Sequence, residues 1–108
     1  MSEYYCYLIS SEKNPRSTYI GITNNLNNRL KKHNGILKGG AKATRKHKDW
    51  YFVKVIKLES KSDALKLEWY WKHYKNGKGN WVHTKPGIDN KLKRLEEILD
   101  DYVHTIEI

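Results

Sequence analysis

Hydrophobic and polar positions divide the 108-residue chain into three strand-like runs and three helix-like runs. The strand-like runs, rich in aromatic and β-branched residues, are 4–10, 17–23 and 50–58. The helix-like runs, with apolar residues every three or four positions, begin near Leu26, Ser60 and Ile88. A loop is expected at 76–87. The order predicts an α+β fold of the ββαβα type plus a C-terminal helix. It also predicts a single domain over 1–108, with a core at about 4–75 and a helical extension at about 88–102.

The first two strand-like runs are separated by a connector rich in turn-forming residues, so a β-hairpin is expected. If the turn centres near Lys13, Tyr7 lies opposite Tyr19 and Tyr5 lies opposite Gly21. These four residues then share one face of the hairpin, because side chains alternate between faces along a strand.

The helix ends carry their own signals. Thr23 or Asn24 is expected to cap the first helix, which should stop near Asn34 and Gly35. Ser60 is expected to cap the second helix. The inward positions are predicted to be Ala64, Leu67, Trp71 and Tyr74 on the second helix, and Ile88, Leu92, Leu95 and Leu99 on the last.

The net charge of +9 indicates that the protein binds a negatively charged partner. Residues 13–48 contain ten Lys or Arg and no acid, whereas residues 89–108 carry a net charge of −3. Solvated faces usually mix signs, so phosphate contacts explain the cluster better and indicate a polyanionic partner. The candidate nucleic-acid-binding residues are Lys31, Lys32, Lys38, Lys42, Thr44, Arg45, Lys46 and Lys48.

Several protein classes are excluded by what the chain lacks. Cys6 is the only cysteine, so neither a disulfide framework nor a cysteine-based zinc set can form. No apolar run resembles a signal peptide or reaches membrane-spanning length. We therefore expect a soluble, intracellular protein without membrane contact, in the nucleus of a eukaryote or otherwise in the cytoplasm.

Glu68 is a carboxylate placed among Leu67, Trp69, Tyr70 and Trp71. It could simply reach solvent or pair with a lysine such as the one four residues later. Alternatively, a single carboxylate with water and substrate phosphate is an ordinary arrangement for one Mg²⁺ or Mn²⁺ ion, which would stabilise charge on a scissile phosphate.

The phenols and one arginine also admit two interpretations each. Tyr7 and Tyr19 could pack across the strands, or one could act as a general base if its pKa were lowered. Arg29 could be an exposed helix charge, or its guanidinium could grip two phosphate oxygens. The four tryptophans could stack on bases, but most are expected in the core because the domain is small.

At these residues the chain resembles the GIY-YIG nuclease superfamily. The second signature is Tyr19-Ile20-Gly21, and 24–34 looks like the helix that follows it in the family. Segments 39–45 and 67–73 are most similar to the Slx-type subunit, a structure-specific endonuclease, and to small stand-alone bacterial members. The similarity covers about 4–75. It implies a small domain with a three-stranded antiparallel sheet flanked by helices.

The resemblance implies roles for five residues. Tyr7 and Tyr19 match the tyrosines of the two signatures, Arg29 the phosphate-gripping arginine and His33 the neighbouring active-site histidine. Glu68 matches the sole protein ligand of a divalent metal. Tyr7 is our preferred general base and Tyr19 a positioning phenol, although the family leaves this choice open.

Two departures from the family are visible. The first signature reads Tyr5-Cys6-Tyr7 and lacks its glycine, which the expected register tolerates by placing Tyr5 over Gly21. The cysteine-rich zinc domain of eukaryotic Slx-type subunits has no counterpart here. Docking to a scaffold protein through that domain is therefore not carried over, and the partner and oligomeric state stay open.

The prediction is a metal-dependent DNA endonuclease, selective for branched DNA such as flaps or junctions, in repair or recombination. One rival is a non-catalytic nucleic-acid-binding module that uses the same basic surface. A second rival is a sequence-specific cutter of the restriction or homing type, but no recognition domain is visible.

Overall fold

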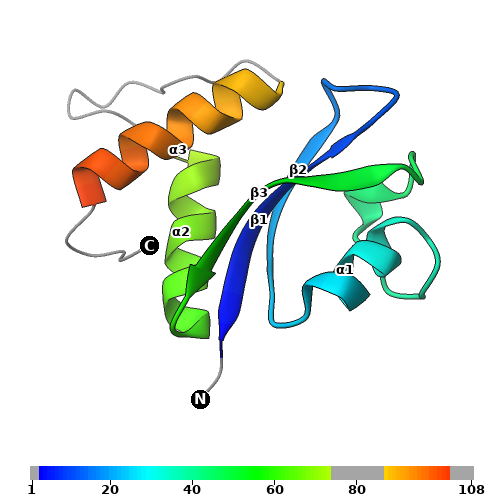
Figure 1. Ribbon diagram of the computed structural model, residues 1–108, viewed down its shortest axis with the longest axis horizontal. Helices are drawn as coiled ribbons and strands as arrows, with labels where there is room; N and C mark the ends of the chain where they lie inside the picture. The colour runs from blue at the N-terminus through cyan, green and yellow to red at the C-terminus, as the bar shows by residue number, and fades with distance from the viewer. Residues whose placement is uncertain (1–2, 74–86, 103–108) are drawn as a thin grey trace.

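The computed structural model describes residues 3–73 and 87–102. The elements are β1 (Tyr4–Ser11), β2 (Thr18–Thr23), α1 (Leu26–His33), the 3₁₀ helix η1 (Lys42–Thr44), β3 (Trp50–Leu58), α2 (Lys61–His73) and α3 (Ile88–Tyr102) (Figure 1). The predicted order, ββαβα with a C-terminal helix, is confirmed. The loop expected at 76–87, except Gly87, and the inward position of Tyr74 lie outside the described residues.

The strands form one antiparallel sheet in the order β2-β1-β3. The central strand β1 is buried from Cys6 to Ser11, because it has a neighbour on each side and helices on both faces. Its side chains alternate between two core clusters. Cys6 and Leu8 belong to one, and Tyr7 and Ile9 belong to the other.

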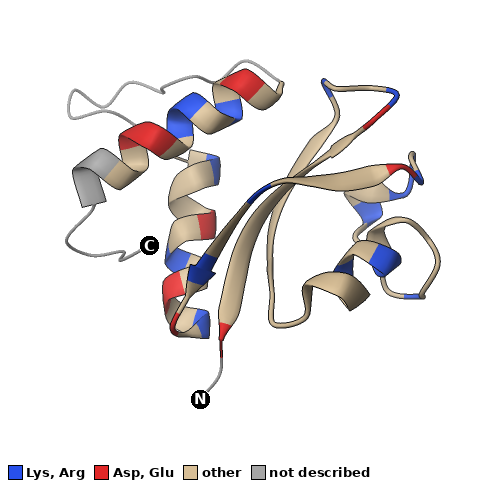
Figure 2. Ribbon diagram, viewed as in Figure 1, with Lys and Arg blue, Asp and Glu red and all other residues tan. Residues whose placement is uncertain are grey.

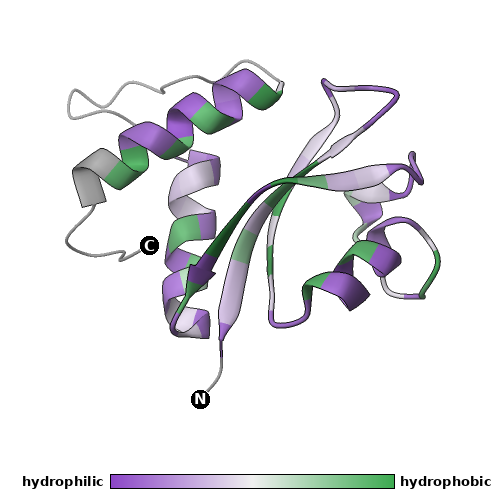
Figure 3. Ribbon diagram, in the orientation of Figure 1, coloured by the Kyte–Doolittle hydropathy of each residue, from purple (hydrophilic) through white to green (hydrophobic). Residues whose placement is uncertain are grey.

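The helices lie on opposite faces of this sheet, with α2 and α3 on one side and α1 on the other (Figure 1). Figure 3 shows α3 banded in green and purple, as the amphipathic pattern predicted. Leu95 is buried, and Leu92 and Leu99 pack against the same cluster, as expected. Ile98, which the sequence analysis did not place inward, is also fully buried there.

The predicted hairpin register is wrong by two residues. Tyr7 pairs with Gly21, Ile9 with Tyr19 and Tyr5 with Thr23. The turn centres one residue later than expected, because the amide of Ser17 donates to the carbonyl of Asn14 at 2.9 Å. This places Pro15 at the second turn position, where its fixed φ is favourable. A shift of two keeps the faces, so the tyrosines and Gly21 still share one side.

The first helix is capped one or two residues later than predicted. The Asn25 side chain accepts a hydrogen bond from the Asn28 amide at 3.1 Å, while the Thr23 hydroxyl is occupied by the Asn25 amide at 3.0 Å. The predicted cap of α2 is confirmed, because the Ser60 hydroxyl accepts from the Asp63 amide at 3.1 Å. Within the described part of the chain, no helix has the length and hydropathy needed to span a membrane.

Candidate functional site

Two phenols and a glycine meet on the α1 face of the sheet. The rings of Tyr7 and Tyr19 have centroids 6.5 Å apart. A Cβ atom on Gly21 would lie 2.6 Å from the Tyr7 hydroxyl oxygen and 3.0 Å from a ring carbon of Tyr19. Only glycine leaves space for both rings at this point of the edge strand.

A chain of hydrogen bonds runs from α1 through the Tyr7 hydroxyl to η1. Arg29 Nε donates to the Tyr7 oxygen at 3.3 Å, and that hydroxyl lies 2.7 Å from His33 Nε2. On the other side of the ring, His33 Nδ1 lies 2.9 Å from Thr44 Oγ1, which donates to the Ala41 carbonyl at 2.9 Å. Since the single Thr44 proton is given to Ala41, His33 Nδ1 must carry the hydrogen toward Thr44. His33 Nε2 is then the acceptor for the proton of Tyr7.

Burial sets the protonation states in this chain. Burial raises the pKa of Tyr7 to about 12, although the guanidinium of Arg29 acts in the opposite sense. Burial, together with the charge of Arg29, lowers the pKa of His33 to about 4. Burial alone would lower the pKa of Arg29, but the hydroxyls of Tyr7 and Tyr19 outweigh it and raise that pKa. At neutral pH the site therefore holds a neutral phenol beside a neutral imidazole and a fixed positive charge.

The backbone after α1 holds these groups in place. A Cβ on Gly40 would collide with the Lys32 carbonyl oxygen, so a glycine allows this segment to lie directly on the helix backbone. The Gly39 carbonyl accepts from Arg29 Nη1 at 3.1 Å. The carbonyl of Thr44 accepts from Trp50 Nε1 at 2.9 Å, which anchors η1 to β3.

Glu68 lies on α2, which covers the opposite face of the sheet from Tyr7. Its helix, α2, packs against β1 and β2, and its charge acts both on Cys6 and on Tyr7, which face opposite sides of β1. Glu68 Oε2 lies 3.3 Å from Lys72 Nζ, which in turn lies 5.6 Å from the centroid of the Tyr19 ring. The lysine pairing that the sequence left open is therefore present, and it occurs beside the Tyr19 ring.

The residues present fit a hard divalent cation in one way only. Among the described residues, no group of three or more His, Cys, Asp or Glu could hold a metal ion. Glu68 offers one carboxylate, and its side chain is 22% exposed. Mg²⁺ commonly keeps several waters and uses one or two carboxylates together with substrate phosphates. The site thus suits an ion whose coordination is completed by water and a phosphodiester.

The predicted basic residues lie on α1 and the following segment, where Figure 2 shows blue on the helix and no red. All except Lys32 and Thr44 are exposed, namely Lys31, Lys38, Lys42, Arg45, Lys46 and Lys48. Thr44 is buried and its hydroxyl is used by His33 and Ala41. This placement argues against contact of its hydroxyl with nucleic acid and suggests that Thr44 orients His33.

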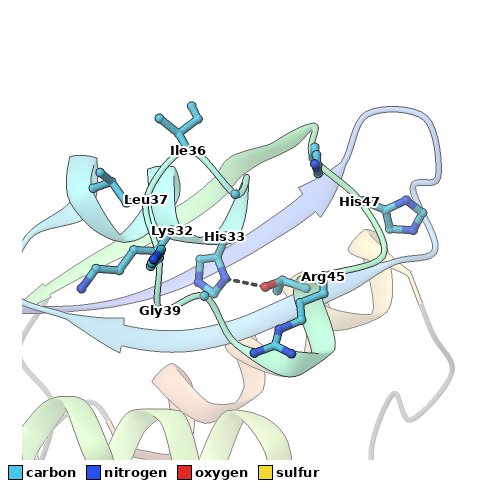
Figure 4. A pocket seen from close by; sticks show the side chains of 12 residues that line it. Lys32, His33, Ile36, Leu37, Gly39, Arg45 and His47 are labelled. Carbon is cyan, nitrogen blue, oxygen red and sulfur yellow. Dashed lines mark hydrogen bonds between the residues drawn. The ribbon is translucent and has the colours of Figure 1, made fainter.

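A pocket of about 560 Å³ lies between α1 and η1, bordering the hydrogen-bonded chain. His33 and Thr44 form part of its wall, and Lys32 and Arg45 lie at its rim (Figure 4). This opening is an entrance from the basic surface toward the buried imidazole.

Most of the four tryptophans were expected in the core, and two of them are found there. Trp50 and Trp71 are buried, whereas Trp69 is exposed and Trp81 lies outside the described residues.

Sequence reasoning missed the role of Thr44 and the contact between Lys72 and the Tyr19 ring. No local pattern signals either, because both depend on segments far apart in the chain. Of the five residues predicted to form the site, Tyr7, Tyr19, Arg29 and His33 are in direct contact with one another. Glu68 is connected to Tyr19 only through Lys72.

Comparison with known proteins places these features in a family. The family model described as the GIY-YIG catalytic domain matches residues 3–80. The chain is 44% identical over 73 residues to a protein of Talaromyces marneffei named structure-specific endonuclease subunit slx1, a match covering 65% of this chain and 19% of that protein. Proteins with the same name from Schizosaccharomyces japonicus and Aspergillus clavatus are 43% and 36% identical. Those matches cover 65% and 90% of this chain but 26% and 20% of the relatives, so the chain spans about a fifth to a quarter of their length.

Proposed function

Because the chain belongs to the GIY-YIG family, we propose that it is a divalent-metal-dependent endonuclease that hydrolyses phosphodiester bonds in branched DNA. The observation that carries the proposal is the hydrogen-bonded series Arg29, Tyr7 and His33, with Glu68 connected to the neighbouring Tyr19 ring through Lys72. A purely structural ion pair or aromatic cluster would not need these four groups together.

The substrate class follows from the surface and from the relatives. A cluster of cations without acids binds the DNA backbone and carries no base sequence information by itself. The relatives are named structure-specific endonuclease subunits, which agrees with selection by DNA shape. We accordingly assign flaps or junctions as substrates, and repair or recombination as the context, in the nucleus of a eukaryote or the cytoplasm of a bacterium. The word subunit in those names supports a protein partner for this chain as well.

Tyr7 is the proposed general base, and it works through His33. A phenol with a pKa of about 12 is protonated at neutral pH, so it accepts a proton from water only if it passes its own proton on. His33 Nε2 is neutral and 2.7 Å away, which allows that transfer. The proton of the attacking water moves to Tyr7, and the proton of Tyr7 moves to His33.

Arg29 has two proposed roles: it covers the Tyr7 hydroxyl in the free protein, and it binds the phosphate of the substrate. Tyr7 has no solvent exposure in the free protein, and the Arg29 contact to its oxygen is long at 3.3 Å. A phosphate would draw the guanidinium away into a bidentate contact and open the phenol to water. Tyr19, half-exposed beside Lys72, would position the phosphate or the water. Glu68 would hold the divalent cation, which supplies charge stabilisation for the scissile phosphate and the leaving oxygen.

The test is cleavage of a labelled 5′ flap with and without Mg²⁺ by wild type, Glu68→Gln and Arg29→Ala. Both variants should lose activity by about a hundredfold or more, and EDTA should abolish wild-type cleavage. Glu59→Gln is the matched control, because it removes an exposed carboxylate just before α2. Unchanged cleavage by both site variants would refute the assignment. Salt-sensitive binding without any cleavage would favour the non-catalytic module instead.

A panel of linear, flap and four-way substrates tests the substrate class. Cleavage of linear duplex at fixed sequences would favour a sequence-specific cutter, whereas cleavage at the branch of unrelated sequences would support selection by shape.

A further inference from the structure

Two exposed aliphatic side chains stand in the middle of the basic surface. Ile36 is 71% exposed and Leu37 is 40% exposed. Figure 4 shows Ile36 projecting outward from the loop after α1, with Leu37 and Lys32 on the same side of the pocket. Single exposed apolar residues are ordinary, but an adjacent pair surrounded by cations calls for a binding partner.

The backbone under this pair is fixed by the end of α1. Gly35 has φ +76°, its amide donates to the Lys32 carbonyl at 3.2 Å, and the Ile36 amide donates to the Lys31 carbonyl at 2.8 Å. These two bonds make the Schellman termination of a helix. The Leu37 amide also donates to Lys31 at 3.2 Å.

This termination makes the exposure of Ile36 informative. The residue in its position usually packs back on the last turns of the helix. Ile36 instead keeps most of its surface in solvent, so helix capping does not account for its side chain. The aliphatic pair is held on an ordered support and turned outward, as a protruding contact requires.

The surrounding charge determines what such a contact would meet. Lys32, Lys38 and Lys48 line the same pocket as the pair, and no acid occurs between residues 13 and 48. The pocket beneath the loop is lined by both aliphatic residues together with His33 and Thr44 of the site. An apolar pair that shares its pocket with several cations fits a ligand with apolar stacked faces and a polyanionic border, which is the exposed end of a nucleic-acid duplex.

We infer that Ile36 and Leu37 form a wedge that packs against the terminal base pair at the branch point of DNA. The inference rests on the proposed function and deepens it, because it names what recognises the branch. Aliphatic wedges that unstack a base step while cations hold the phosphates are an established mode of DNA contact. Here the wedge would hold the duplex end, and the pocket would lead one strand toward His33 and Tyr7.

The test measures binding, not cleavage. Fluorescence anisotropy in EDTA compares a labelled 5′ flap with a linear duplex of the same sequence, for wild type, Ile36→Ser and the double variant Ile36→Ser/Leu37→Ser. The double variant should bind the flap about tenfold more weakly and the linear duplex within twofold of wild type. The salt dependence should not change, since no phosphate contact is removed.

Leu65→Ser is the matched control, because Leu65 is 46% exposed on α2, away from the basic segment. It should leave both affinities unchanged. A 2-aminopurine in the base pair next to the branch should brighten with wild type and with Leu65→Ser, and stay dim with the double variant. Circular dichroism of each variant checks folding, and Ile36→Ser alone serves if the double variant is unfolded.

Three outcomes would overturn the wedge. The first is that the double variant loses the same affinity for the flap and for the linear duplex, and the second is that it loses no affinity for the flap. The third is that the protein binds anionic phospholipid vesicles through Ile36 and Leu37, while its affinity for the flap does not change in the double variant. The wedge and the nuclease can fail separately. If the double variant loses its preference for the flap but the wild type does not cleave DNA in Mg²⁺, only the proposed hydrolysis is refuted. If the wild type cleaves DNA and the double variant keeps its preference for the flap, only the wedge is refuted.

Discussion

Replacing Gly21 by alanine tests both the register of the hairpin and the position of the proposed general base. The new Cβ would lie 2.6 Å from the Tyr7 hydroxyl oxygen and 2.9 Å from its Cζ atom, whereas ordinary contact begins near 3.4 Å. About 0.8 Å must be gained at the closest atom. Tyr7 is fully buried and held by His33 and Arg29, so it has little freedom to move.

Two effects of the substitution oppose each other. Overpacking a filled site costs about 1–3 kcal/mol. Replacing glycine by alanine restricts the unfolded chain and returns about 0.4–1 kcal/mol. The net expectation for Gly21→Ala is a loss of about 1–2 kcal/mol in the free energy of unfolding. Because Tyr7 must shift relative to His33, the rate of flap cleavage should fall by at least about tenfold at a temperature where the variant is folded.

Urea unfolding of a double-mutant cycle isolates the responsible contact. Tyr7→Phe removes the oxygen at 2.6 Å and leaves the carbon at 2.9 Å, so Gly21→Ala should cost less in that background. A coupling energy of at least about 0.5 kcal/mol is expected between the two positions. A parallel cycle with Tyr5→Phe should show no coupling, because Tyr5 pairs with Thr23.

The two registers give opposite results in these cycles. Coupling of Gly21 to Tyr5, with none to Tyr7, would mean that the turn centres near Lys13. An unchanged urea midpoint for Gly21→Ala would mean that the space beside Tyr7 is open, and the packing argument for this glycine would fail.

Three further predictions concern charge, metal and helix stability. Between pH 6.5 and about 4 the unfolded state binds more protons at His33 than the folded state does. The free energy of unfolding should therefore fall as the pH falls, by at most about 1.4 kcal/mol per pH unit. His33→Gln should make this pH dependence weaker in urea unfolding. Lys72→Met removes the cation 3.3 Å from Glu68, in a pair whose side chains are 39% and 22% exposed. The affinity for Mn²⁺, measured by calorimetry, should therefore rise, but by no more than about fivefold. An unchanged affinity would mean that Lys72 does not affect metal binding at Glu68. Asn25→Ala should cost about 1 kcal/mol in urea unfolding and Asn25→Ser much less, whereas equal loss would contradict the cap.

The strands and helices could be predicted because their signals are local. Aromatic and β-branched residues mark β3, and a serine cap followed by a periodic stripe marks α2. The register could not be derived in this way. It depends on which residues of the connector occupy the central turn positions, and one residue of error in the turn moves every pair by two.

The candidate site could be predicted from the sequence at the level of residue types, but the protonation states of its groups could not. The sequence indicates a phenol and an imidazole as candidates, and it predicts that a tyrosine acting as a base has a lowered pKa. In the free protein burial acts in the opposite direction, because it raises the pKa of Tyr7 and lowers that of His33. The proposed catalysis by Tyr7 therefore requires the imidazole to take the phenol proton, and Thr44 fixes the tautomer that can do so. Thr44 is available for this because Gly40 lets its segment lie on the α1 backbone, a contact between positions that sequence spacing does not connect.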